Sequence, residues 1–124
     1  MVMFDPQDDK GYQTIMGPAG AMLAVLEKVE PYVDGFTVHM KIGNPTSAGF
    51  SGIKGTIRWG RQFDDKKNDT FNQLAEKTIE LKDFLPAGAW TIVKFNIGPA
   101  APDQVRRIVF APQFDTIQLR ETAR

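Results

Sequence analysis

The chain has 124 residues, 42% of them hydrophobic, and its 15 basic residues balance 15 acidic ones, so the formal net charge is zero. This length is typical of one folded domain, and we interpret residues 1–124 as a single unit. The zero charge argues against a nucleic-acid binder, which usually carries a basic excess to neutralise phosphates. Because the chain has no cysteine, disulfides, thiolate catalysis and cysteine-ligated zinc are excluded.

The N-terminal part of the chain predicts two strands after a polar lead-in. Residues 1–11 are polar and rich in turn-forming residues, and are interpreted as a loop. Tyr12–Met16 is predicted to be a short strand that ends at a Gly-Pro-Ala-Gly turn. Ala21–Glu30 fits a strand that is buried on both faces at its start, because apolar residues occupy both the even and the odd positions there. Its alanine, leucine, glutamate and lysine residues also form helices well, so a helix is the alternative.

The strongest signal lies at Phe36–Ile42, where apolar and polar residues alternate strictly. The apolar positions are Phe36, Val38, Met40 and Ile42. Alternation with a period of two predicts a strand with one buried face. The pair Asp34-Gly35 predicts a turn, and the short connection predicts that this strand pairs with Ala21–Glu30.

Three further strands follow. Phe50–Trp59 alternates around Gly55, a position where glycine predicts a bulge or room for a large neighbour. Ala75–Leu81 and Ala89–Ile97 show the same half-buried pattern, with Trp90 on the outward face of the second.

The C-terminal part predicts shorter elements. Pro102–Arg106 fits one helical turn, and Pro112 divides two predicted short strands, Arg107–Ala111 and Thr116–Arg120. Residues 121–124 are expected to be a frayed tail.

Seven or eight short strands separated by turn sequences, with at most one short helical turn, predict an all-β fold. We expect a two-layer antiparallel β-sandwich with an immunoglobulin-like arrangement. A barrel of the oligonucleotide-binding type is the alternative.

Few residues carry the pattern of a reactive site. His39 is the single histidine and lies on the polar face of its strand, where we expect it to be solvated. The carboxylates at 5, 8 and 9 and at 64, 65 and 69 lack the spacing of a calcium loop and are interpreted as solvated loop charge. No phosphate-binding glycine motif or nucleophile elbow occurs. We therefore expect a non-enzymatic protein with no catalytic residue, metal site or cofactor.

Two regions are candidates for an interaction surface. The segment 60–72 is too polar to pack and is predicted to be an exposed loop, whereas Trp90 and Phe50 are aromatics that either bind a ligand or pack at the rim of the core. The candidate interaction residues are Arg61, Asp64, Asp65, Lys66, Lys67 and Trp90.

A family resemblance rests on three short motifs, Tyr32-x-Asp34-Gly35, Ile42-Gly43-Asn44-Pro45 and Trp59-Gly60. In these motifs the chain resembles the YajI-type bacterial lipoproteins, a family of uncharacterised function, and in its strand pattern the LEA-type (water-stress) β-sandwich domains. The motif residues are Gly35, Gly43, Asn44, Pro45, Trp59 and Gly60.

The motif residues have structural roles in this interpretation. Asn44 is expected to satisfy backbone groups where its strand ends, and Pro45 to stop the strand pairing. Gly35 and Gly60 are expected to adopt turn conformations with positive φ, and Trp59 to close one end of the core.

The resemblance implies an exported, extracytoplasmic domain, periplasmic and tethered to a membrane by a lipidated cysteine upstream of this chain. The residues themselves leave a cytoplasmic location open as the alternative. The leading hypothesis is a non-enzymatic binding or scaffold module of the bacterial cell envelope. Its partner would be an envelope protein or a glycan, and its contact surface a sheet edge or the loop at 60–72. One alternative is a carbohydrate-binding or carbohydrate-active domain that uses Trp90. The second is a barrel that binds single-stranded nucleic acid.

Overall fold

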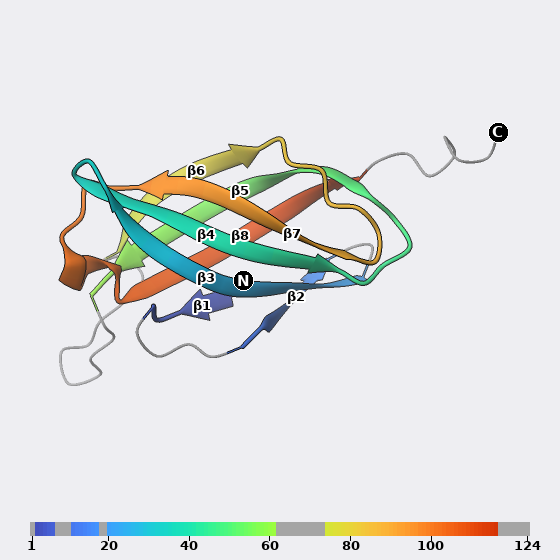
Figure 1. The fold of residues 1–124 in the computed structure, drawn as a ribbon, viewed down its shortest axis with the longest axis horizontal. Coiled ribbons are helices and arrows are strands. Elements are labelled where there is room, and N and C mark those ends of the chain that lie inside the picture. The colour runs from blue at the N-terminus through green and yellow to red at the C-terminus, as the bar shows by residue number, and fades with distance from the viewer. Residues whose placement is uncertain (1, 7–10, 18–19, 62–73, 117–124) are drawn as a thin grey trace.

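The computed structural model describes residues 2–6, 11–17, 20–61 and 74–116, which form two stacked antiparallel sheets (Figure 1). One sheet has the strand order β1-β8-β5-β6 and the other β2-β3-β4-β7. The elements are β1 (Val2–Phe4), β2 (Gln13–Gly17), β3 (Gly20–Tyr32), β4 (Gly35–Asn44), β5 (Phe50–Gly60), β6 (Ala75–Leu81), β7 (Ala89–Ile97), η3 (Pro102–Val105) and β8 (Arg107–Thr116). The predicted two-layer sandwich is confirmed. The barrel alternative is wrong, because the strands form two separate sheets.

The core lies between the apolar faces of the two sheets. In β4 the inward side chains of Val38, Met40 and Ile42 are completely buried, which confirms the strand predicted at Phe36–Ile42. Phe95 from β7 stacks against Phe110 from β8 with ring centroids 6.1 Å apart, and so joins the two sheets across the core.

Strands β3 and β4 form a long hairpin, so the strand interpretation of Ala21–Glu30 is confirmed and the helix alternative is wrong. Their pairing runs from Leu23 opposite Gly43 to Tyr32 opposite Gly35. The hairpin turn is therefore Val33-Asp34, and not the predicted Asp34-Gly35. Val33 has a φ of 54°, a conformation that β-branched residues rarely adopt, and its side chain is 90% exposed.

Two boundary predictions are wrong. Residues 1–11 are not entirely loop, because Val2–Phe4 forms β1 and pairs with Ile108–Phe110 of β8. A strand of three residues is too short for its alternation to be recognised in a sequence. Strand β8 also runs without a break through Pro112. Since β1 covers only Ile108–Phe110, β8 has one neighbouring strand at Pro112, an edge-like position that proline tolerates.

The remaining predictions near the C-terminus divide between described and undescribed residues. The helical turn expected at Pro102–Arg106 is confirmed as the 3-10 turn η3. Residues 117–124, which include most of the strand predicted at Thr116–Arg120 and the expected tail, lie outside the described residues.

Gly55 does not mark a bulge. The register shifts of β5 and β3 lie between Phe50 and Gly52 and between Leu26 and Lys28. Gly55 pairs with Pro112 of β8, and a Cβ atom at this position would lie 2.2 Å from the carbonyl oxygen of Ala111. The glycine therefore permits a close backbone approach between β5 and β8.

Candidate functional site

Asn44, at the end of β4, organises a buried polar cluster and is 2% exposed. Its Nδ2 donates to the carbonyl oxygens of Ala48 (2.7 Å) and Leu85 (3.1 Å). Its Oδ1 accepts from the backbone N–H (3.0 Å) and the hydroxyl (2.7 Å) of Thr46. One side chain thus fixes the β4–β5 connection and the segment that precedes β7, which is an architectural role.

Gly35 and Gly60, which were expected to adopt turn conformations, instead permit close packing with neighbouring residues. Among the described glycines, positive φ values occur at Gly11, Gly20, Gly55, Gly88 and Gly98, so the expectation for Gly35 and Gly60 is wrong. A Cβ at Gly35 would lie 2.1 Å from the carbonyl oxygen of Ile97, and one at Gly60 would lie 2.4 Å from Cδ2 of Leu74. Both glycines admit neighbours that are distant in the sequence.

Trp90 forms an exposed platform on the outward face of β7. Its six-membered ring lies against Gly43, where a Cβ would be 2.8 Å from the ring, yet 46% of the residue is exposed. The ammonium group of Lys41 is 5.5 Å from the ring centroid, a cation–π distance. A hollow of about 150 Å³ borders the ring, lined by Leu23, Gly43, Asn44, Pro45, Gly88, Ala89 and Trp90.

The other candidate aromatics pack in the interior. Phe50 is 4% exposed and contacts Phe114 at a centroid distance of 5.9 Å, so it offers no ligand surface. Trp59 is 4% exposed and lies at the far end of β5, where it borders a hollow with Arg61 and Gln104.

The candidate interaction residues do not form one surface in the described part of the chain. Trp90 lies near the start of β7, which pairs with the end of β4. Strand β5 begins near that end and runs away from it, so Arg61 lies at the opposite end of the sandwich. Asp64, Asp65, Lys66 and Lys67 lie outside the described residues.

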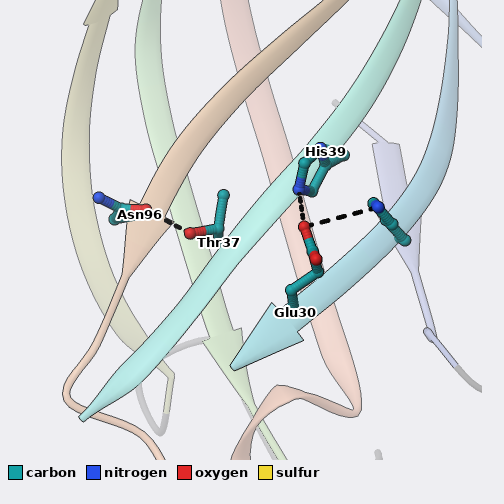
Figure 2. Close-up of polar contacts among 5 residues, drawn as sticks. Glu30, Thr37, His39 and Asn96 are labelled. Atoms are coloured by element: carbon teal, nitrogen blue, oxygen red, sulfur yellow. Dashed lines mark hydrogen bonds and ion pairs between the residues drawn. The ribbon is translucent and has the colours of Figure 1, made fainter. Parts of the chain in front are cut away.

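His39 is buried, contrary to the expectation of a solvated residue, with 9% of its surface exposed. Strand β4 has neighbours on both sides, and its register places His39 between Lys28 of β3 and Lys94 of β7. Nε2 of His39 lies 2.5 Å from Oε1 of Glu30, and Nζ of Lys28 lies 3.6 Å from the same oxygen. Figure 2 shows the carboxylate turned toward the imidazole, beside the Thr37–Asn96 hydrogen bond of 2.7 Å.

The pKa of Glu30 is held below its ordinary value of 4.5. The hydrogen-bonding contact with His39 is the largest cause, loss of solvation opposes it, and the charge of Lys28 adds to the lowering. The folded state therefore binds the Glu30 proton more weakly than the unfolded state. This contributes stability above pH 4.5, and the contribution is lost as the pH falls through the folded-state pKa.

We expect Glu30→Gln to remove this pH dependence. Wild-type protein should lose more stability between pH 6 and pH 3 than the variant, measured as urea midpoints. Glu27→Gln, an exposed carboxylate on the same strand, is the matched control and should follow the wild type. Parallel wild-type and Glu30→Gln curves would contradict this assignment.

Other titratable groups serve structure in the described part of the chain. Asp5, which was expected to be solvated loop charge, forms a bidentate ion pair with Arg106. Both N–O distances are 2.9 Å. Within residues 2–6, 11–17, 20–61 and 74–116, no group of three or more histidine, aspartate or glutamate residues is placed to hold a metal ion. No helix in this part is long and apolar enough to cross a membrane.

Comparisons with known proteins support the fold. No protein-family model and no curated protein matches the sequence. Among solved structures, the trimeric lipoprotein SadB of Salmonella enterica matches with a TM-score of 0.72 and 19% identity, over 92% of this chain and 58% of that one. The solution structure of the uncharacterised lipoprotein YajI of Escherichia coli matches with a TM-score of 0.62 and 18% identity, over 95% of this chain and 70% of that one.

This chain has the fold of these two lipoproteins. The resemblance to the YajI-type lipoproteins, drawn from the motifs around Asn44 and Trp59, is thereby confirmed at the level of the fold. The chain spans little more than half of the length of SadB, so it corresponds to a part of that protein.

Proposed function

We propose that this chain is the folded, extracytoplasmic part of a lipid-anchored protein of the bacterial cell envelope. It acts there as a non-enzymatic binding or scaffold module. The observation that carries the proposal is the fold similarity to SadB over 92% of the chain, together with the similarity to a second lipoprotein, YajI. Both proteins are lipoproteins, and the proposal extends that membrane attachment to the protein that contains this chain.

The surface around Trp90 is better suited to a protein partner than to a glycan. Trp90 and Ile92 are 46% and 49% exposed on the outward face of β7, and Leu23 lines the adjoining hollow. Glycan sites combine an aromatic ring with several polar groups that fix the orientation of the hydroxyls. Here the one buried amide at the hollow, that of Asn44, already makes four hydrogen bonds within the protein.

Self-association is part of the proposed scaffold role. SadB is trimeric, and a zero net charge gives this chain little electrostatic protection against contact between copies. We therefore expect at least one partner of the module to be another copy of itself.

Localisation of the natural gene product tests the proposal. With a C-terminal epitope tag on the chromosomal gene, we expect the protein in the membrane fraction, released by detergent and not by high salt, and labelled by radioactive palmitate. A tagged cytoplasmic enzyme and a known lipoprotein serve as fractionation controls. Recovery in the cytoplasmic fraction without label would overturn the envelope assignment.

A further inference from the structure

In the part of the chain that the structure describes, the two sheets have four edge strands, which differ in how well they are protected against pairing with another strand. Strands β1 and β2 have only three and five residues. The part of β8 that β1 leaves uncovered contains Pro112, and the part of β3 that β2 leaves uncovered contains a register shift and Pro31. Strand β6 carries Glu76 and Glu80, which pair with Arg58, Lys54 and Lys82, and charged side chains discourage edge pairing. Strand β7 is a nine-residue edge without proline, and its register with β4 has no shift. It is the long, regular and mainly apolar edge.

The backbone of β7 presents alternate residues to this free edge. The two-residue turn at Val33-Asp34 makes Tyr32 and Gly35 a hydrogen-bonded pair. The backbone N–H and C=O groups of the odd-numbered residues of β4 therefore form hydrogen bonds with β3. Those of the even-numbered residues form hydrogen bonds with β7. Since Met40 pairs with Val93, the odd-numbered residues of β7 bond to β4. The N–H and C=O groups of Trp90, Ile92 and Lys94 consequently point away from the sheet.

A side-chain contact agrees with this assignment. Nζ of Lys77, on β6 at the same side of the sandwich, donates to the carbonyl oxygen of Asn96 at 2.8 Å. The carbonyl oxygen of Asn96 therefore points away from β4, as expected for an even-numbered residue of β7. Lys77 covers the end of the edge at Asn96. Among the described residues, the backbone hydrogen bonds of turns and loops do not use the outward groups of Trp90, Ile92 and Lys94.

The side chains leave the edge open to a neighbouring strand. The indole of Trp90 leans inward over Gly43 of β4, so it does not overhang the edge. Ile92 is 49% exposed, while its neighbour Val93 is completely buried on the other face. A partner strand can thus approach without disturbing the core.

We infer that the free edge of β7 pairs with β7 of a second copy of this chain, antiparallel and centred on Ile92. In this register Ile92 faces Ile92 of the other copy and Trp90 faces Lys94. Each of these pairs exchanges both backbone hydrogen bonds. The two four-stranded sheets become one eight-stranded sheet.

The sequence of the edge suits this two-fold arrangement. An apolar pair lies at the centre, and each Lys94 faces Trp90 of the other copy and not another lysine. The two Lys94 residues are offset by about 14 Å along the strands, at about 3.4 Å per residue, which exceeds the screening length of roughly 8 Å at physiological salt. The two Lys94 residues therefore do not oppose one another, and a second copy is the partner that this edge complements.

This inference rests on the proposed scaffold role and names its partner, but it is tested on the isolated chain in solution and needs no membrane. Sedimentation equilibrium of the chain should show a reversible dimer. Ile92→Lys places two lysines directly opposite each other and should weaken the dimer about tenfold or more. Thr78→Lys, the same change on the outward face of the β6 edge, is the matched control and should leave the dimer unchanged.

Cross-linking tests the register itself, because the chain has no cysteine of its own. Ile92→Cys should form a disulfide-linked dimer on mild oxidation, since facing residues of such a pair lie about 5.5 Å apart between Cα atoms. Lys94→Cys and Thr78→Cys should not. A chain that stays monomeric at high micromolar concentration, a chain that assembles as a trimer, or a dimer that Ile92→Lys does not weaken would overturn the inference. Circular dichroism verifies that each variant is folded, and membrane fractionation separately decides the envelope assignment.

Discussion

Replacing Asn44 with alanine should lower the free energy of unfolding by about 3 kcal/mol. The substitution removes four hydrogen bonds made by a side chain that is 2% exposed, each with a net value of about 1 kcal/mol. The carbonyls of Ala48 and Leu85 keep a second donor, the hydroxyl of Thr46 and the backbone N–H of Phe50. The backbone N–H of Thr46 loses its acceptor, which carries a desolvation cost. Urea unfolding at pH 7, followed by circular dichroism, measures the change.

Asn96→Ala is the matched control for Asn44→Ala. Asn96 is exposed, and its side chain bonds to the hydroxyl of Thr37 alone among the described residues, so its loss should change stability by no more than about 0.5 kcal/mol. If Asn44→Ala cost as little as this control, water would replace the amide, and the cluster would not hold the two connections in place.

Gly55→Ala should be the second most damaging of these changes, with a loss of about 2–3 kcal/mol. Its Cβ would lie 2.2 Å from the carbonyl oxygen of Ala111 and 2.8 Å from Cα of Pro112. Both are backbone atoms of the paired strand, so no side-chain rotation relieves the overlap. The β5–β8 ladder would have to separate locally, and the thermal midpoint should fall accordingly.

Gly88→Ala distinguishes steric overlap from backbone conformation. Gly88 has a φ of +71°, but a Cβ atom added there would meet nothing within 4 Å, so alanine should cost only about 1 kcal/mol through the conformation itself. Equal losses for Gly55→Ala and Gly88→Ala would refute the close-approach explanation for Gly55.

Most strands were predictable because alternation is a local property. The buried face of β4 follows directly from Phe36, Val38, Met40 and Ile42, and β6 and β7 have the boundaries predicted from the sequence. The errors have non-local causes. Strand β1 exists because β8 offers it a pairing edge, and β8 continues through Pro112 because β1 is short.

The candidate site was less predictable for the same reason. The exposure of Trp90 follows from its parity in β7, but its contact with Gly43 depends on the register between two strands that are distant in the sequence. The burial of His39 depends on both neighbouring strands, and Gly35 is required by the backbone of Ile97. A free edge is likewise defined by strand order, which no single segment encodes.

The different surroundings of Trp59 and Trp90 give the protein two built-in optical reporters, because the chain has just these two tryptophans. Trp59 is 4% exposed, so its fluorescence reports whether the sheet that contains β5 is folded. Trp90 is 46% exposed, and a soluble quencher reaches it in the native state. The fluorescence of Trp59 therefore reports folding, while the quenching of Trp90 reports whether a partner covers the outward face of β7.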